Sequence, residues 1–66
     1  MSNIGKNIKR FRKEKNISQD RLSKLADVSL NLIAKLELEN NQNPTIETLQ
    51  KIAKALGVSI ENLIKK

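Results

Sequence analysis

Apolar residues recur every three or four positions along most of the chain, which is the period of an amphipathic helix. Ile4, Ile8 and Phe11 stand at i, i+4 and i+7 and predict a helix over residues 3–15. A longer stripe predicts a helix over residues 46–56, with inward positions at Ile46, Leu49, Ile52, Ala53 and Leu56. No segment alternates apolar and polar residues with period two. The chain is therefore expected to be all-α.

Short polar residues that favour helix N-caps stand just before four of the expected helices. They are Ser18, Ser29, Thr45 and Ser59. The resulting helices cover residues 19–26, 30–38, 46–56 and 60–64. Inward positions are expected at Leu22, Leu25 and Ala26 in the helix over 19–26, and at Ile60, Leu63 and Ile64 in the last one. Gly57 stands where a left-handed C-cap belongs. The 66 residues have room for one domain, spanning 1–66.

The excess of positive over negative charge lies in the first part of the chain. Thirteen Lys and Arg against seven Asp and Glu give a net charge of +6. Residues 1–24 carry this whole excess, and residues 25–66 are neutral overall. Such a cluster is typical either of a solvated face that keeps a small protein in solution or of a surface that binds a polyanion.

The residue types present exclude several functions. The chain has no Cys and no His, which excludes disulfides, Cys/His zinc sites, thiol nucleophiles and histidine bases. We therefore expect no enzyme, no metal site and no cofactor. Phe11 is the sole aromatic residue, too few for a base-stacking platform. No apolar run is long enough for a membrane span, so a cytoplasmic protein without membrane contact is expected.

Two of the expected helices, over 19–26 and 30–38, are joined by the three-residue turn Asp27-Val28-Ser29. This is the spacing of a helix-turn-helix. In that motif the first helix packs across the second, whose outer face can enter a DNA major groove.

Longer stretches of the sequence carry further motifs beyond the spacing of these two helices. The chain from Ile17 to Glu37, followed by the segment from Asn43 to Ser59, resembles the Cro/Xre-type, phage-repressor-like helix-turn-helix family. The most specific matches are Ser18-Gln19, Val28-Ser29, Leu36-Glu37, Asn43-Pro44-Thr45 and the run from Ala53 to Gly57. The resemblance covers Ile4 to Leu63. It implies a compact five-helix domain that regulates transcription by binding double-stranded operator DNA, usually as a homodimer.

The resemblance also implies roles for single residues. Leu30, Asn31, Leu32 and Lys35 occupy positions that read DNA bases. Ser18, Gln19 and the loop residues Asn40, Asn41 and Asn43 occupy positions that meet phosphates. Arg12 and Glu37 match a salt bridge between the first and third helices. By their charge, Lys9, Arg10 and Lys13 are expected to be further phosphate contacts.

Three positions depart from the family pattern. Ser23 replaces a usual Ala, Asp27 replaces the usual turn Gly, and Glu39 stands where a Gly commonly ends the third helix. Asp enters the left-handed conformation less readily than Gly, although more readily than most residues. Glu39 would allow the third helix to run longer.

The outer face of the helix over 30–38 leaves a second interpretation open. On a helical wheel only Asn31 and Lys35 offer the donors and acceptors that base reading favours. Leu30, Ala34 and Leu38 recur at i, i+4 and i+8 as an apolar ridge that suits helix packing. The alternative function is therefore a diverged or engineered scaffold whose third helix binds a protein partner or a second copy of the chain.

Overall fold

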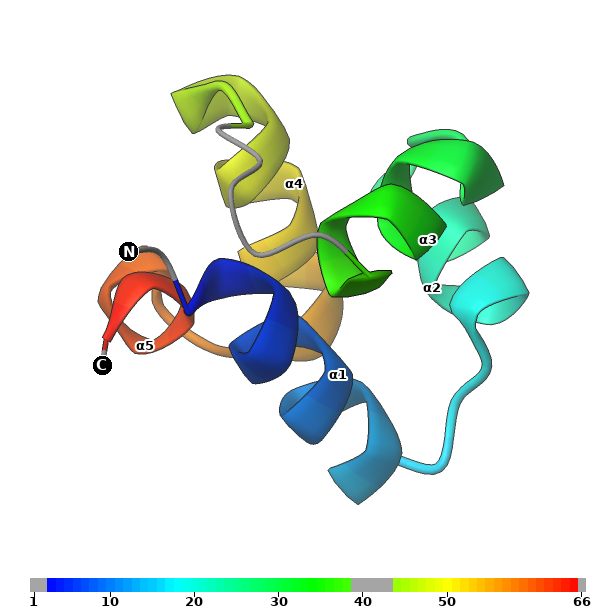
Figure 1. Cartoon of the computed structure of the whole chain (residues 1–66), viewed down its shortest axis with the longest axis horizontal. Helices are drawn as coiled ribbons and strands as arrows, with labels where there is room; N and C mark the ends of the chain where they lie inside the picture. Colours follow the sequence, from blue (N-terminus) through cyan, green and yellow to red (C-terminus); the bar gives the residue numbers. More distant parts are fainter. Residues whose placement is uncertain (1–2, 39–43, 66) are drawn as a thin grey trace.

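The computed structural model describes residues 3–38 and 44–65. Within them the chain forms five helices: α1 (Ile4–Glu14), α2 (Gln19–Ala26), α3 (Leu30–Leu38), α4 (Ile46–Leu56) and α5 (Ile60–Ile64). The last four have the bounds that the sequence predicts, and α1 begins and ends one residue inside its expected range. The described residues contain no strand, so the all-α expectation is confirmed. In Figure 1, α2 and α3 lie together on one side and α4 and α5 on the other.

Each of the four expected N-cap residues performs that role. Ser18, Ser29, Thr45 and Ser59 each accept a hydrogen bond through the side-chain oxygen from the backbone N–H three residues later, at 3.0–3.1 Å. A cap satisfies one of the N–H groups that a helix start leaves without a partner. The short polar residues therefore decide where α2, α3, α4 and α5 begin.

The turns after α1, α2 and α4 each contain a residue with positive φ: Asn16 at 57°, Asp27 at 56° and Gly57 at 70°. Gly57 is thus the expected left-handed C-cap. Asp27 adopts the same conformation although it carries a side chain. Its backbone N–H donates to the carbonyls near the end of α2, so the Asp preserves the turn that a Gly usually makes.

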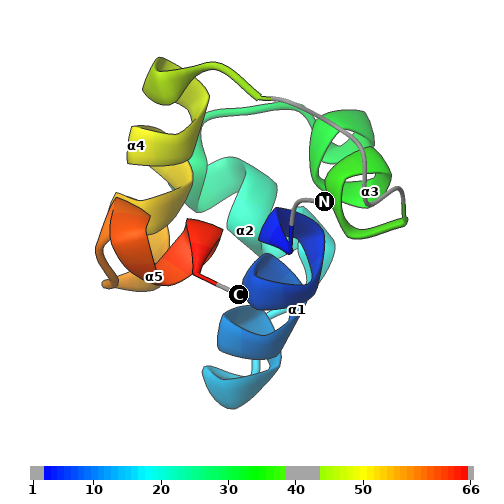
Figure 2. The same cartoon turned by 60° about the vertical axis from the view of Figure 1, so that its left-hand side comes forward.

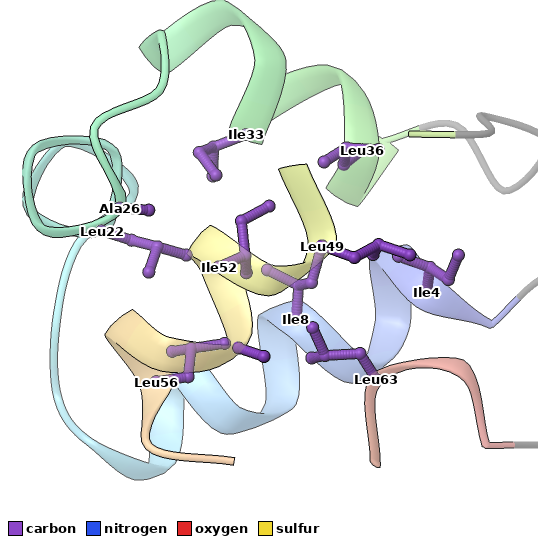
Figure 3. Close-up of a cluster of buried hydrophobic side chains, with 11 residues drawn as sticks. Ile4, Ile8, Leu22, Ala26, Ile33, Leu36, Leu49, Ile52, Leu56 and Leu63 are labelled. Carbon is purple, nitrogen blue, oxygen red and sulfur yellow. The ribbon is translucent and has the colours of Figure 1, made fainter. Parts of the chain in front are cut away.

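The core forms where side chains from all five helices converge (Figure 3). Ile8, Leu22, Ile33, Leu36, Ile52, Leu56 and Leu63 are almost completely buried. Contacts between the helices place α3 against α1 and α2, while α4 packs on α2 and α1, and α5 packs on α1 and α4. Figure 2 shows α3 beside α1 and away from α5. One face of α3 is therefore buried while its outer face stays uncovered by the described helices.

Three of the expected inward positions are wrong. Leu25 is 48% exposed, and Ile46 and Ile64 are also exposed. The buried positions of α2 are Leu22, Ser23 and Ala26, which leaves Leu25 on the flank of that helix. Ile46 is the first residue of α4, one turn before the first buried residue of that helix. Periodicity gives the direction of an apolar face but not how far the neighbouring helices extend along it.

Two residues of α1 fix its distance from its neighbours. A Cβ on Gly5 would overlap the backbone carbonyl of Leu36 in α3, so only glycine allows this approach. The Asn7 side-chain amide is buried and donates to the carbonyl oxygens of Leu63 and Lys65, both at 2.7 Å. Gly5 thus sets the packing of α1 on α3, and Asn7 joins α1 to the end of α5.

Candidate nucleic-acid interface

The uncovered face of α3 carries most of the residues expected to meet DNA bases. Ile33 and Leu36 point into the core and are buried. Asn31 and Lys35 are exposed. Leu30 is 43% exposed and Leu38 is 81% exposed. The structure therefore presents a mixed polar and apolar surface along the outside of α3.

Leu32 differs from the other three expected base-reading residues. Its side chain is half-buried and packs against the hydrophobic core. Part of the Leu32 side chain therefore contributes to packing, and the rest remains exposed. The base contact expected of Leu32 stays a prediction, with less of its side chain exposed than at Asn31 or Lys35.

A groove of about 380 Å³ runs between α1, the start of α2 and α3. We call it the basic groove. Its lining residues are Lys9, Arg12, Lys13, Gln19, Ala34, Glu37 and Leu38. Lys9 and Lys13 are one helical turn apart and both are exposed. Three residues expected to contact phosphates, Lys9, Lys13 and Gln19, are thus brought together beside the outer face of α3.

An ion pair joins the helices at this groove. The Arg12 guanidinium donates through Nε to Glu37 Oε2 at 2.7 Å and through Nη2 to Glu37 Oε1 at 2.9 Å. The two side chains are only 11% and 4% exposed. Arg12 also donates to the carbonyl of Ile17 at 2.9 Å, and Gln19 Nε2 donates to Glu37 Oε1 at 3.1 Å. This network connects α1, the chain entering α2, and α3.

The environment of Glu37 lowers the pKa of its carboxyl group. Burial opposes ionisation, but the hydrogen bonds from Arg12 and Gln19 and the charges of Arg12 and Lys9 outweigh it. The hydrogen bond to Glu37 in turn raises the pKa of Arg12. Both groups are therefore charged at neutral pH, and the Glu37 carboxylate is already engaged by partners.

The N-terminus of α2 opens beside the basic groove. The backbone N–H of Arg21 is capped by Ser18, whereas those of Gln19 and Asp20 have no hydrogen-bond partner in the described part of the chain. Free N–H groups and the helix dipole favour an anion at this position. The Asp20 carboxylate would oppose one, but Lys24 pairs with it at 3.2 Å. The Gln19 amide keeps a second N–H for a further acceptor.

The remaining expected phosphate contacts have different outcomes. Arg10 is exposed but does not line the basic groove, and its guanidinium lies over the Phe11 ring, 4.8 Å from the ring centre. The phosphate contact expected of Arg10 stays a prediction. Asn40, Asn41 and Asn43 lie outside the described residues.

Sequence reasoning did not identify the contact between Gln19 and Glu37, which lie 18 positions apart. It also noted Ser23 only as a departure from the family pattern. Ser23 is buried, and its hydroxyl donates to the Asp20 carbonyl at 2.6 Å within its own helix. This internal bond explains why a polar residue is accepted at that position.

Among residues 3–38 and 44–65, no group of three acidic side chains could hold a metal ion. No helix in that part of the chain is long and apolar enough to cross a membrane.

Comparisons with known proteins agree with this geometry. A sequence model of the helix-turn-helix family matches residues 8–63. The HTH-type transcriptional regulators SinR of Bacillus licheniformis and Bacillus subtilis are 35% and 36% identical over 63 and 61 residues, or 96% and 92% of this chain. The chain spans 57% and 55% of the length of these two relatives.

The solved N-terminal DNA-binding domain of SinR from Bacillus subtilis superposes with a TM-score of 0.91 at 34% identity, over 97% of this chain and 93% of that one. The family match covers more than half of the chain and includes α2, the turn and α3. The chain therefore belongs to the helix-turn-helix family, of the Cro/Xre-like type that its motifs resemble.

Proposed function

We propose that this chain is a sequence-specific, double-stranded DNA-binding transcriptional regulator that places α3 in the major groove. The observation that carries the proposal is the exposed pair Asn31 and Lys35 on α3, beside a groove with Lys9 and Lys13. Asn and Lys supply donors and acceptors for base edges, and lysines beside them supply charge for phosphates. SinR, whose DNA-binding domain has the same fold, supports this function.

The proposed binding mode has two parts. The phosphates on one side of the major groove contact the α2 N-terminus and the side chains of Lys9, Lys13, Ser18 and Gln19. Asn31 and Lys35 contact base edges: Asn suits adenine N6 and N7, and Lys suits guanine O6 and N7. The protein acts by occupying DNA, without a catalytic step, in the cytoplasm. A homodimer would place two copies of α3 about one turn of DNA apart.

The test is the salt dependence of binding to duplex DNA. Each phosphate neutralised contributes a slope of about −0.9 to the plot of log affinity against log salt. Replacing Lys9 or Lys13 with Gln should weaken binding to all duplexes and reduce the slope by about one. Lys54→Gln is the matched control, because Lys54 is an exposed lysine on α4 outside the basic groove. Equal effects of all three substitutions, or binding that ignores salt, would contradict the proposal.

A second candidate function rests on the high exposure of Leu38, 81%, and of Leu30. Exposed leucines on a helix suit a contact with another protein or a second copy of the chain. Leu38→Glu distinguishes this from DNA reading. Loss of self-association by Leu38→Glu in sedimentation, with no preferred duplex for the wild type, would favour the protein contact. A monomer that selects one duplex would exclude self-association through α3.

A further inference from the structure

The outer surface of α3 consists of two parallel rows. Asn31 and Lys35, at i and i+4, form a polar row, and both are exposed. Leu30, Ala34 and Leu38, at i, i+4 and i+8, form an apolar row next to it. The buried side of the helix is provided by Ile33 and Leu36. A surface that enters the major groove would therefore carry apolar side chains beside its hydrogen-bonding ones.

The three residues of the apolar row have different surroundings. Ala34 and Leu38 line the basic groove together with Lys9 and Lys13, so they lie beside the expected path of the phosphates. Leu30 does not line that groove, and it begins α3. In a helix-turn-helix the N-terminal residues of the second helix are the ones that reach base edges. Leu30 is therefore the apolar residue placed to meet a base.

We propose that Leu30 is a specificity-determining residue that reads the 5-methyl group of thymine. This inference rests on the proposed function and adds to it the class of base that the site selects. The thymine methyl is the apolar group that base pairs display in the major groove. Leu30 has no hydrogen-bonding atoms in its side chain and is 43% exposed, so contact with that methyl removes apolar surface of both groups from water.

The same leucine disfavours other bases. A base edge of donors and acceptors pressed against Leu30 would lose water without gaining a partner, and an unpaired polar group is costly to bury. Asn31, the next residue, suits adenine. Leu30 and Asn31 together therefore favour a target rich in A·T pairs where α3 begins, with thymine facing Leu30.

Uracil substitution tests this directly, because uracil pairs like thymine but lacks the methyl group. A duplex preferred by the wild-type protein would be selected from random DNA, and each thymine then replaced singly by uracil. One position should lose affinity roughly fourfold, the effect of one buried methyl-sized group. In Leu30→Ala the same replacement should change affinity by less than about 1.5-fold.

Leu25→Ala is the matched control, since Leu25 is a leucine of α2 exposed to a similar extent, 48%, and lies off α3. It should retain the fourfold uracil effect. Leu30→Ser provides a second variant if Leu30→Ala fails to fold by circular dichroism. If no single uracil weakens wild-type binding, or if the loss persists in the Leu30 variants, the inference is wrong while the DNA-binding function stands. A wild-type protein that prefers no duplex overturns both.

Discussion

The Arg12–Glu37 ion pair connects α1 to α3 beside the basic groove, with both side chains almost removed from solvent. Glu37 also accepts a hydrogen bond from Gln19, so one carboxylate holds the start of α2 and the end of α3 together. The relative position of these helices determines where the surface for DNA lies. The pair therefore bears on both stability and function.

Removing one partner of a buried pair leaves a buried charge uncompensated and costs about 3–5 kcal/mol. Because a domain of this size has a total stability of only about 3–5 kcal/mol, Glu37→Ala should be largely unfolded at 25 °C, as measured by urea denaturation. The exposed Asp20–Lys24 pair is the control. Asp20→Ala should cost about 1 kcal/mol or less. A Glu37→Ala domain as stable as the wild type would contradict the structural role of the pair.

The lowered pKa of Glu37 predicts how stability depends on pH. Because the folded-state pKa is below the unfolded value of about 4.3, the unfolded chain binds the proton first. The stabilisation is thus complete above the unfolded pKa and is lost as pH falls through the folded value. Unfolding free energy measured from pH 7 down to pH 2.5 should decline below about pH 4. Gln19→Ala, which lacks one hydrogen bond to Glu37, should show a smaller decline, and an equal one would argue against this contact.

Gly5 has a different role, because it allows α1 to approach the backbone of α3. Gly5→Ala would improve helix propensity but would force a Cβ against the Leu36 carbonyl, which cannot move like a flexible side chain. We expect a net loss of about 1–3 kcal/mol from overpacking, measured as a lower midpoint in thermal unfolding. Lys6→Ala, at the exposed neighbouring position, should change stability by less than about 0.5 kcal/mol. A stabilised Gly5→Ala domain would show that the helices are not in close contact.

At the scale of the elements, the turn between α2 and α3 sets the geometry of the helix-turn-helix. Asp27 holds a left-handed conformation there, with φ of 56°. Its neighbour Val28 donates to the Ser23 carbonyl at 3.0 Å, which closes the end of α2. The turn therefore depends on a residue that accepts positive φ.

Substitutions at Asp27 should follow this backbone requirement. A β-branched residue is strongly disfavoured at positive φ, and the left-handed conformation costs an ordinary residue about 1–2 kcal/mol. Asp27→Val should therefore be less stable than Asp27→Gly by about 1–2 kcal/mol in urea denaturation. Equal stability of the two variants would mean that the turn does not need the left-handed conformation.

The helices could be predicted because their starts and stops are local. Ser18 and Ser59, for example, cap the residues three positions later, so a short window of sequence is sufficient. The exposure of Leu25 could not be predicted in this way, because it depends on which side of α2 packs on α3 and α4. The Gly5 contact and the Gln19–Glu37 bond likewise join residues from different helices. The pairing of Arg12 with Glu37 could be predicted only from the family resemblance.

Helix packing and the distribution of charge both favour the outer face of α3, with the basic groove beside it, as the surface for DNA. The described helices leave the outer face of α3 uncovered, since α4 packs on α2 and α1, and α5 packs on α1 and α4. The net charge of +6 belongs entirely to residues 1–24, which include α1 and most of α2. Of these basic residues, Lys9 and Lys13 border the basic groove next to α3. The molecule thus combines an attraction for a polyanion with an adjacent surface able to distinguish bases.

The most direct measurement of the central claim compares the affinity of the wild-type protein and Asn31→Ala for a selected duplex and for a scrambled one. Because Asn31 is proposed to contact a base edge, its loss should cost about 1–3 kcal/mol on the selected duplex and little on the scrambled one. Specificity should therefore fall while non-specific affinity stays. Equal loss on both duplexes, or a wild-type protein with no preference between them, would contradict the account of α3 as the helix that reads DNA.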